Sequence, residues 1–326
     1  MNRLDEWRSD GFLSAALAWA DAALAREGRH RSSGPTWTRI RPWGAVFSLP
    51  LTDGDAVWFK ATPDGSAEPI LHQTLNAEIP EFVAPGLAAD LTRGWLLLDD
   101  AGTSLGTSAE AAGRQPCGDP RFLRAMTRYA SLQEQLRHRV DELVAQGLPD
   151  ARPRALPGVF DQLLASLGRR ARDTGDDGAA ALLVRIAAAR PVVVDLAARC
   201  EARAGSVDHN DLHPWNILVR DGQIVFLDWG DAMAAHPYAS LLVPLRIAGT
   251  ESRENADAVM AAYGQGRDEA IDPAELAAVA RLAVIARAWT WQRSLALTVG
   301  VSEHDGAPLE WLARILDPDP FAPARD

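Results

Sequence analysis

The pattern of apolar and polar positions divides the chain into a strand-rich first part and a helix-rich second part. Residues 4–27 have the spacing of an amphipathic helix, and a polar linker follows up to Pro35. Residues 68–78 are expected to form a helix ended by Pro80, and residues 95–98 a buried strand. Before these come three β-prone runs, at 37–41, 45–49 and 56–60.

From residue 105 onward the apolar spacing is mostly helical. Asp119-Pro120 predicts a helix start, with a cap followed by a first-turn proline, and Gly147 predicts its end. Further helices are expected at 158–167, 177–203, 254–263 and 273–298, with a last short one around Trp311. These patterns predict an α+β protein with a small antiparallel sheet followed by a large helical region.

A hairpin interrupts the helical part. Two short apolar runs, 217–219 and 224–227, flank Asp221-Gly222. Asp-Gly between β-prone runs predicts a tight two-residue turn, because both central positions take positive φ. The turn is therefore expected to fold Asp228 back toward the residues that precede the hairpin.

Those preceding residues carry chemistry. Asp211 and Asn216 lie just before the hairpin, and Asp228 lies just after it. A carboxylate, an amide and a second carboxylate at one end of a hairpin form the arrangement that phosphoryl transfer needs. One carboxylate orients the attacking hydroxyl, while the amide and the other carboxylate hold magnesium on the phosphates.

The motif His209-x-Asp211-x-x-x-x-Asn216, followed by Asp228-Trp229-Gly230, resembles the catalytic loop and metal-binding motif of the protein-kinase-like fold. His213 makes the loop more similar to the aminoglycoside phosphotransferase and choline kinase family. That family usually reads His-Gly-Asp-Leu-His. Asn210 replaces the glycine here, and asparagine tolerates the same unusual backbone.

The resemblance implies a bilobal fold and an ATP- and Mg²⁺-dependent transfer. Asp211 is then the catalytic base, and Asn216 and Asp228 are the metal ligands. His209 and His213 are expected to support the loop. The implied domains are an N-terminal helix and linker, an N-lobe that ends in a hinge, and a C-lobe with the acceptor site, at 1–35, 36–103 and 104–326.

Lys60 stands out by composition. Lysine and arginine together number 33, and Lys60 is the only lysine, so 33 − 1 = 32 are arginines. The two residues differ where a compact charge on a slim stem must reach one point. A single retained lysine is therefore a functional candidate. In the resembled fold the lysine at the end of the third strand grips the nucleotide phosphates.

Other nucleotide-site candidates follow from position in the resembled fold. Gly44, in the first hairpin, is a candidate for bringing peptide N–H groups to phosphate oxygens, and an ordinary hairpin turn is the alternative. Glu68 is the candidate carboxylate partner of Lys60, with Glu78 as the alternative. The hinge is expected near residues 99–103. Leu98, Asp99 and Asp100 are the nucleotide-site candidates there, with a turn or cap role as the alternative for the two acids.

Charge and composition limit the partners and the compartment. The net charge of −11 over 326 residues disfavours nucleic acid as a partner and suits a cationic acceptor. No apolar run approaches the length of a membrane helix, and the N-terminus lacks the pattern of a signal peptide. With only Cys117 and Cys200 present, a cytoplasmic location is expected. The oligomeric state does not follow from the sequence.

The acceptor is expected to be a small molecule with a hydroxyl group. Asp231 and Asp208 are expected at the mouth of the site, as substrate contacts or as solvated loop acids. Trp289, Trp291 and Trp311 are candidates for an acceptor wall, with core packing as the alternative that their helical spacing favours. Where the family often has an acid, the chain reads His-Pro-Tyr-Ala-Ser at 236–240.

An aminoglycoside-like or amino-sugar acceptor is the first hypothesis. A choline, homoserine or sugar kinase and a catalytically silent nucleotide-binding regulator are the alternatives. The single glycine of the first turn and the lack of an Ala-Pro-Glu segment disfavour a protein kinase.

Overall fold

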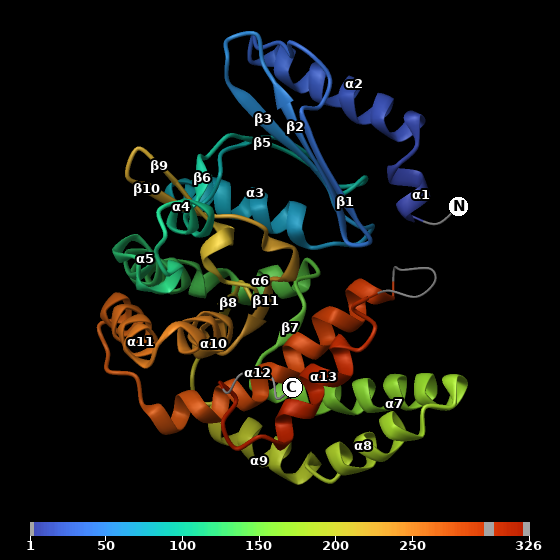
Figure 1. Cartoon of the computed structure of the whole chain (residues 1–326), viewed down its shortest axis with the longest axis vertical. Coiled ribbons are helices and arrows are strands. Elements are labelled where there is room, and N and C mark those ends of the chain that lie inside the picture. Colours follow the sequence, from blue (N-terminus) through green and yellow to red (C-terminus); the bar gives the residue numbers. More distant parts are fainter. Residues whose placement is uncertain (1–2, 297–302, 322–326) are drawn as a thin grey trace. The chain divides into compact units, whose positions relative to one another are not determined.

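The computed structural model describes residues 3–296 and 303–321, and their contacts form two compact units (Figure 1). Within the described part, unit 1 comprises residues 3–103, 218–230 and 294–296. Unit 2 comprises residues 104–217, 231–293 and 303–321. The hairpin around Asp221-Gly222 thus groups with the N-terminal sheet, although it follows the candidate catalytic loop in sequence. The partition into 1–35, 36–103 and 104–326 stays a prediction about domains.

Unit 1 is built on a five-stranded antiparallel sheet of order β1-β2-β3-β5-β4. Its strands are β1 Trp37–Arg41, β2 Gly44–Pro50, β3 Ala56–Ala61, β4 Gly86–Asp90 and β5 Trp95–Asp99. The three N-terminal strands and the strand at 95–98 were predicted and are confirmed. The prediction missed β4, whose Gly-Leu-Ala-Ala-Asp sequence lacks apolar alternation and whose pairing shifts register between Gly86 and Ala88.

One face of this sheet packs against α2 (Asp10–Arg26). The ring of Phe12 lies 6.1 Å from Phe47 and 5.8 Å from Trp95 between centroids. The single helix predicted over 4–27 is wrong, because α1 (Arg3–Trp7) ends before α2 begins. Ser9 separates them: its Oγ accepts a hydrogen bond from the Phe12 N–H, which caps α2.

The other face of the sheet carries Leu96 and Leu98, which pack with Val225 of the hairpin. Helix α3 (Glu68–Glu78), as predicted, also belongs to unit 1. The hairpin consists of β9 (Ile217–Arg220) and β10 (Gln223–Phe226), and β6 (Thr103–Ser104) adds a third strand in the order β10-β9-β6.

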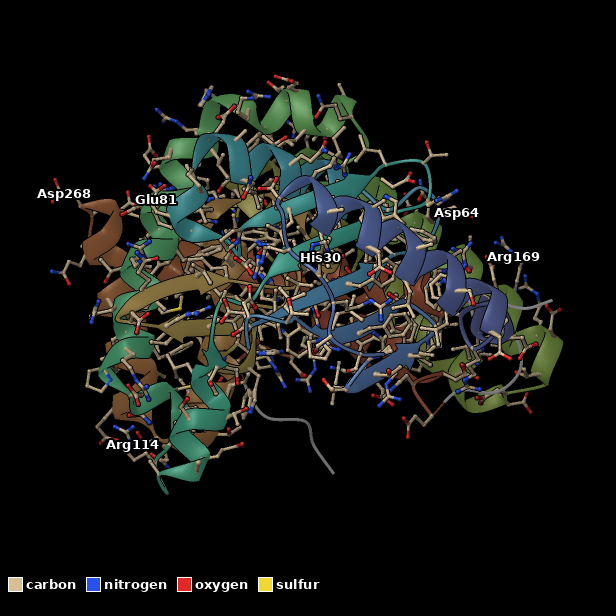
Figure 2. The ribbon with its side chains drawn as sticks, turned by 90° about the horizontal axis from the view of Figure 1, so that it is seen from above. His30, Asp64, Glu81, Arg114, Arg169 and Asp268 are labelled. Carbon is tan, nitrogen blue, oxygen red and sulfur yellow. The ribbon has the colours of Figure 1, made fainter. Side chains whose placement is uncertain are left out.

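The turn of this hairpin has the predicted geometry, with φ of 50° at Asp221 and 80° at Gly222. Figure 2 shows charged side chains such as Asp64 and Glu81 of unit 1 pointing outward, and both are exposed.

Unit 2 is mainly helical. Its helices are α4 Leu105–Ala111, α5 Pro120–Leu136, α6 Val140–Ala145, α7 Leu156–Thr174, α8 Asp177–Ala187, α9 Arg190–Cys200, α10 Leu242–Glu251, α11 Arg253–Arg267, α12 Pro273–Leu295, whose last residues belong to unit 1, and α13 Ala307–Ala313. A small sheet of order β7-β11-β8 joins Asp150–Ala151, Met233–Ala235 and Ser206–Asp208. Strand β8 leads directly into the candidate catalytic loop.

Two predicted helices of unit 2 are each interrupted. The helix expected from Pro120 to Gly147 is α5 and α6, separated by a 3-10 turn at Arg137–Arg139. The helix expected over 177–203 is α8 and α9, and Pro191 lies in the first turn of α9, where its missing N–H costs nothing. No helix within residues 3–296 and 303–321 has the length and apolar character that crossing a membrane requires.

Gly102 lies against the hairpin backbone. Its φ is +100°, and a Cβ there would come within 2.6 Å of the Val219 carbonyl oxygen. We expect Gly102→Ala to lower the free energy of unfolding by about 2 kcal/mol or more, because it combines backbone strain with a clash. Gly113→Ala is the matched control: Gly113 also has positive φ, 65°, but nothing lies within 4 Å of its Cβ position. Urea denaturation of both variants measures the difference, and equal losses would refute the role of the contact.

Candidate active site

The buried charge cluster of unit 1 is centred on Lys60. Its Nζ donates to Glu68 Oε1 at 2.6 Å and to Asp228 Oδ1 at 2.7 Å. Phe59 and Ala61 on either side belong to the α2-facing core, so alternation along β3 sends Lys60 to the opposite face. The lysine side chain is 13% exposed, that of Glu68 4% and that of Asp228 52%. Three predicted site residues from distant parts of the sequence are thus brought together.

The electrostatics keep Lys60 charged. Burial alone would lower the pKa of its ammonium group, but the charges of Asp228 and Glu68 outweigh burial and raise it. Burial raises the pKa of Glu68, and the charge of Lys60 opposes that shift. A buried ammonium held by two carboxylates is a fixed positive charge in unit 1, of which Asp228 is the more exposed end.

Asp228 joins the cluster through a left-handed backbone conformation, and Gly230 lies next to the cluster because it has no side chain. Asp228 has φ of +66°, and a Cβ at Gly230 would lie 3.2 Å from Glu68 Oε2. The Trp229 indole N–H donates to the Phe226 carbonyl oxygen at 3.2 Å, and the Trp229 side chain is buried. In the Asp-Trp-Gly sequence, Asp228 therefore supplies a carboxylate and the buried Trp229 side chain fixes the backbone. Gly230 is small enough to lie against Glu68.

Unit 2 holds the candidate base. Arg287 Nη2 of α12 lies 3.1 Å from Asp211 Oδ1, and His213 Nε2 lies 3.3 Å from Asp211 Oδ2. The Asn216 amide donates to the Asp211 carbonyl oxygen at 3.0 Å. Burial alone would raise the pKa of Asp211, but the Arg287 charge and the His213 hydrogen bond outweigh it and lower the pKa. Asp211 is therefore ionised and held on both carboxylate oxygens.

Asn210 has the backbone conformation that its resemblance to a loop glycine implied, with φ of 60°. Its side-chain amide donates to Thr290 Oγ1 at 2.7 Å and to the Asp231 carbonyl oxygen at 3.2 Å. Arg287 donates to the Asn210 carbonyl oxygen. The asparagine thus adopts the glycine-like turn and also ties the loop to α12, which a glycine cannot do.

Helix α5 holds the other side of the loop. The His209 backbone N–H donates to Tyr129 Oη at 2.7 Å, and Gln133 Nε2 donates to the Val207 carbonyl oxygen at 3.1 Å. His209 itself is fully buried, so its surroundings are those of a core residue. The sequence pattern placed Tyr129 in the core stripe of this helix without indicating these hydrogen bonds.

Asp208 does not lie at the mouth of a site, as the sequence suggested. It is 1% exposed, and its Oδ1 accepts hydrogen bonds from Ser240 Oγ at 2.7 Å and from the Asn210 N–H at 2.8 Å. Burial raises its pKa to about 6. Ser240 stands in the stretch 236–240 that departs from the family pattern, and its hydroxyl donates to an acid supplied here by Asp208.

The remaining nucleotide-site candidates make structural contacts in unit 1. Gly44 pairs with Arg41 at the start of β2, so it ends a hairpin turn. Leu98 is buried in β5. Asp99 Oδ1 accepts from Arg29 at 3.1 Å, and Asp100 Oδ1 accepts from the Trp58 indole at 3.1 Å. Their proposed contacts with a nucleotide stay predictions.

Of the residues predicted for the acceptor site, Asp231 has its Oδ2 3.3 Å from Arg287 Nη1, and Trp289 has its ring centroid 5.4 Å from the Arg293 guanidinium.

Arg287 is a residue of this region that the sequence pattern did not indicate. Its side chain is 8% exposed and contacts both Asp211 and Asp231. In the sequence, however, it is one of the 32 arginines of the whole chain, and it lies in a helix that carries no catalytic motif. A buried position on an apolar helix face was its only signal.

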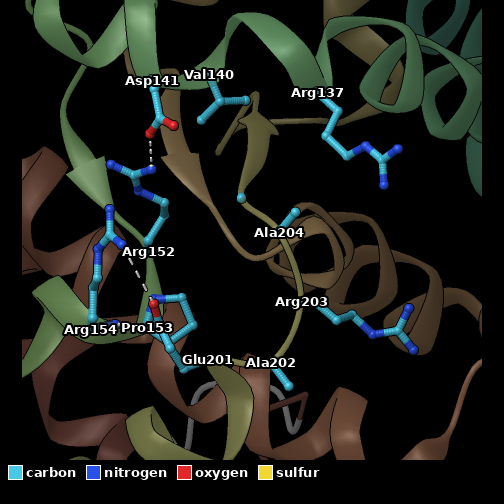
Figure 3. A pocket seen from close by; sticks show the side chains of 11 residues that line it. Arg137, Val140, Asp141, Arg152, Pro153, Arg154, Glu201, Ala202, Arg203 and Ala204 are labelled. Atoms are coloured by element: carbon cyan, nitrogen blue, oxygen red, sulfur yellow. Dashed lines mark hydrogen bonds and ion pairs between the residues drawn. The ribbon is translucent and has the colours of Figure 1, made fainter.

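Unit 2 also contains a cavity of about 450 Å³ that is separate from the candidate site residues (Figure 3). Its lining includes four arginines and two acids, namely Arg137, Arg152, Arg154, Arg203, Asp141 and Glu201. None of the predicted site residues lines it. Arg152 already pairs with Asp141 and Asp150, and Arg203 with Glu269 and Glu275, so these two arginines have carboxylate partners within the protein.

The donor set suits magnesium better than a softer metal. Among residues 3–296 and 303–321, no three His, Cys, Asp or Glu side chains gather as a metal centre. In unit 2, the Asn216 amide nitrogen donates to Asp211, so the Asn216 amide oxygen is the atom suited to a cation. In unit 1, the half-exposed Asp228 carboxylate is a second candidate ligand. Few oxygen ligands from protein, completed by phosphates and water, are typical of Mg²⁺.

The model of the phosphotransferase enzyme family APH matches residues 97–279, which is more than half of the chain. The chain therefore belongs to this family, and the sequence-based resemblance is confirmed. The family identifies the protein as a phosphotransferase, as predicted. No curated protein matches the sequence.

Solved structures establish the fold. A macrolide 2'-phosphotransferase from Brachybacterium faecium is similar with a TM-score of 0.58 and 20% identity, over 94% of this chain and 98% of that one. An ethanolamine kinase from Plasmodium vivax has a TM-score of 0.61 at 13% identity, over 86% and 82%. An amicoumacin kinase, solved with AMP-PNP, Ca²⁺ and its substrate, has a TM-score of 0.55 at 13% identity, over 100% and 98%. These similarities confirm the predicted α+β, protein-kinase-like fold.

We expect Lys60→Arg to lower turnover by about 10²-fold although the charge is kept. Two carboxylates lie 2.6 and 2.7 Å from one compact ammonium, and a planar guanidinium displaces at least one of them. Steady-state kinetics measure the loss. Arg31→Lys, a charge-preserving exchange at the Asp21 ion pair of the same unit, is the control. Near-normal turnover of Lys60→Arg would refute the role of the cluster.

We expect stability to depend on pH through Asp208. Because the folded state raises the pKa of Asp208 from 3.8 to about 6, the folded protein holds this proton more tightly than the unfolded chain. The wild type should lose about 3 kcal/mol relative to Asp208→Asn as the pH rises from about 3 to about 7, with little further change above. Urea denaturation across pH measures this difference. Asp173→Asn, on an exposed part of α7, is the control, and a constant difference for Asp208→Asn would contradict the burial argument.

Proposed function

We propose that the protein is an ATP- and Mg²⁺-dependent kinase that phosphorylates a hydroxyl group of a small molecule. The observation that carries the proposal is the ion cluster in which Lys60 joins Glu68 and Asp228. A fixed ammonium beside a half-exposed carboxylate is suited to holding polyphosphate and its cation. The nucleotide and the divalent ion bound to the amicoumacin kinase support the same cofactor class here.

In this proposal Asp211 accepts the hydrogen bond of the acceptor hydroxyl. It takes the hydroxyl proton as the acceptor oxygen bonds to the γ-phosphorus of ATP and the bond from that phosphorus to the ADP oxygen breaks. Its lowered pKa suits orientation of the hydroxyl more than early proton abstraction, because a weak base removes a proton late. Lys60, oriented by Glu68, holds nucleotide phosphate oxygens. Asn216 and Asp228 would hold the divalent ion, which would neutralise phosphate charge, while ATP would supply the phosphoryl group.

The acceptor proposed first is an aminoglycoside-like or other amino-sugar compound, as the resemblance implies. Choline, homoserine or sugar kinase activity is the alternative within the same class. The buried thiols of Cys117 and Cys200 support a cytoplasmic location. A silent nucleotide-binding regulator is disfavoured, because Lys60 and Asp211 both keep elaborate charge partners.

The direct test is an acceptor panel with ATP and Mg²⁺, using amino sugars, macrolides, choline, ethanolamine, homoserine and a peptide. Mass spectrometry identifies a phosphorylated product, and ADP release gives its rate. Transfer to a small-molecule hydroxyl supports the proposal. Nucleotide binding without transfer to any acceptor would favour the silent regulator, and transfer to the peptide alone would indicate a protein kinase.

We expect Asp211→Asn to lose about 10²–10⁴ in turnover while it still folds and binds ATP. The asparagine oxygen can keep the contact with Arg287, so the change removes the base rather than the loop structure. Calorimetry measures ATP binding, and single-turnover kinetics measure transfer. Asp221→Asn in the hairpin turn is the control for a carboxylate-to-amide change. Unchanged transfer by Asp211→Asn would refute the assignment of the base.

A further inference from the structure

Arg287 lies between two acids of unit 2, Asp211 and Asp231. Nη2 lies 3.1 Å from Asp211 Oδ1, and Nη1 lies 3.3 Å from Asp231 Oδ2. Nη1 also donates to the Asn210 carbonyl oxygen. Arg287 itself is nearly buried, whereas Asp211 and Asp231 are 29% and 33% exposed. The guanidinium thus lies behind the two carboxylates and neutralises them from the protein side.

A second positive charge interacts with one of these acids, Asp231. Arg293 lies on α12 beyond Arg287, and its guanidinium packs over the Trp289 ring. Burial lowers the pKa of Arg293, and the charge of Asp231 opposes that shift. Arg293 Nη1 is buried and makes no hydrogen bond within the described residues. It therefore remains a donor for an oxygen atom of a ligand.

These charges balance. Asp211 and Asp231 contribute two negative charges, and Arg287 and Arg293 contribute two positive ones. His213 lies 3.3 Å from the other oxygen of Asp211 and adds no negative charge. A ligand with several positive charges gains little attraction at such a site, because each carboxylate already has a nearby cation.

We propose that Arg287 is a specificity-determining residue, whose bridge between Asp211 and Asp231 selects an acceptor with at most one positive charge and oxygen-rich surroundings at its reactive hydroxyl. The inference rests on the proposed function. It narrows the amino-sugar hypothesis from polycationic aminoglycosides to acceptors such as singly charged amino sugars. The acidic net charge of the whole chain does not change this, since selectivity depends on the charges that touch the acceptor.

The test measures equilibrium binding without nucleotide, so it does not depend on catalysis. Streptomycin is the polycationic probe, and erythromycin, with one dimethylamino group, is the singly charged probe. Calorimetry at fixed ionic strength compares the wild type with Arg287→Gln and Arg287→Lys. Removing one positive charge beside two carboxylates should tighten streptomycin binding about tenfold or more, with a much smaller change for erythromycin. Arg287→Lys keeps the charge and should bind streptomycin as the wild type does.

Arg281→Gln is the matched control, because Arg281 lies on the same helix and donates to the Ile315 carbonyl oxygen at 3.0 Å instead of bridging acids. Circular dichroism verifies folding of each variant. Arg293→Gln removes the other positive charge while the bridge stays, and it should shift streptomycin binding in the same direction.

Streptomycin affinities within twofold of wild type in both Arg287→Gln and Arg293→Gln, or no streptomycin binding by any of the proteins, would overturn the proposal. Failure of the kinase proposal is distinguishable, because it appears as absent phosphoryl transfer in the acceptor panel whatever the binding results are.

Discussion

The ion cluster around Lys60 is the interaction on which the organisation of unit 1 depends. A lysine in the middle of a sheet has to find carboxylates, because an unpaired buried ammonium costs several kcal/mol. Glu68 and Asp228 supply them from a helix and a hairpin far apart in sequence. One face of the sheet is therefore given to apolar packing with α2, and the other to α3, the hairpin and the charges.

In unit 2 an arginine, Arg287, stabilises the polar and charged groups of the loop. The loop that carries Asp211 turns through a left-handed residue and exposes carbonyl groups, and Arg287, Tyr129 and Gln133 meet its polar groups. Two departures from the family pattern add hydrogen bonds around this loop. Asn210 adds hydrogen bonds that a glycine lacks, and Ser240, in the stretch that departs from the pattern, donates to buried Asp208.

Much of the fold was predictable, and the interrupted helices share one cause of failure. Strands β1, β2 and β3, helix α3 and the Asp221-Gly222 turn follow from local alternation and turn chemistry. The breaks at Ser9 and at Arg137–Arg139 interrupt patterns that read as continuous helices. Helical periodicity reports which face is buried. It does not report whether the axis continues, which depends on what the next turn packs against.

The sequence by itself determined the class of chemistry, because the spacing of Asp211, Asn216 and Asp228 and the single lysine are local or compositional facts. Only the tertiary structure decided which acids are charged and which arginine matters. Asp208 and Asp231 look alike in sequence, yet one is buried under a serine hydroxyl and the other pairs with Arg287. The physical reason is that ionisation and charge balance depend on burial and on partners far along the chain, such as Arg287 for Asp211 (287 − 211 = 76 residues), which no local pattern records.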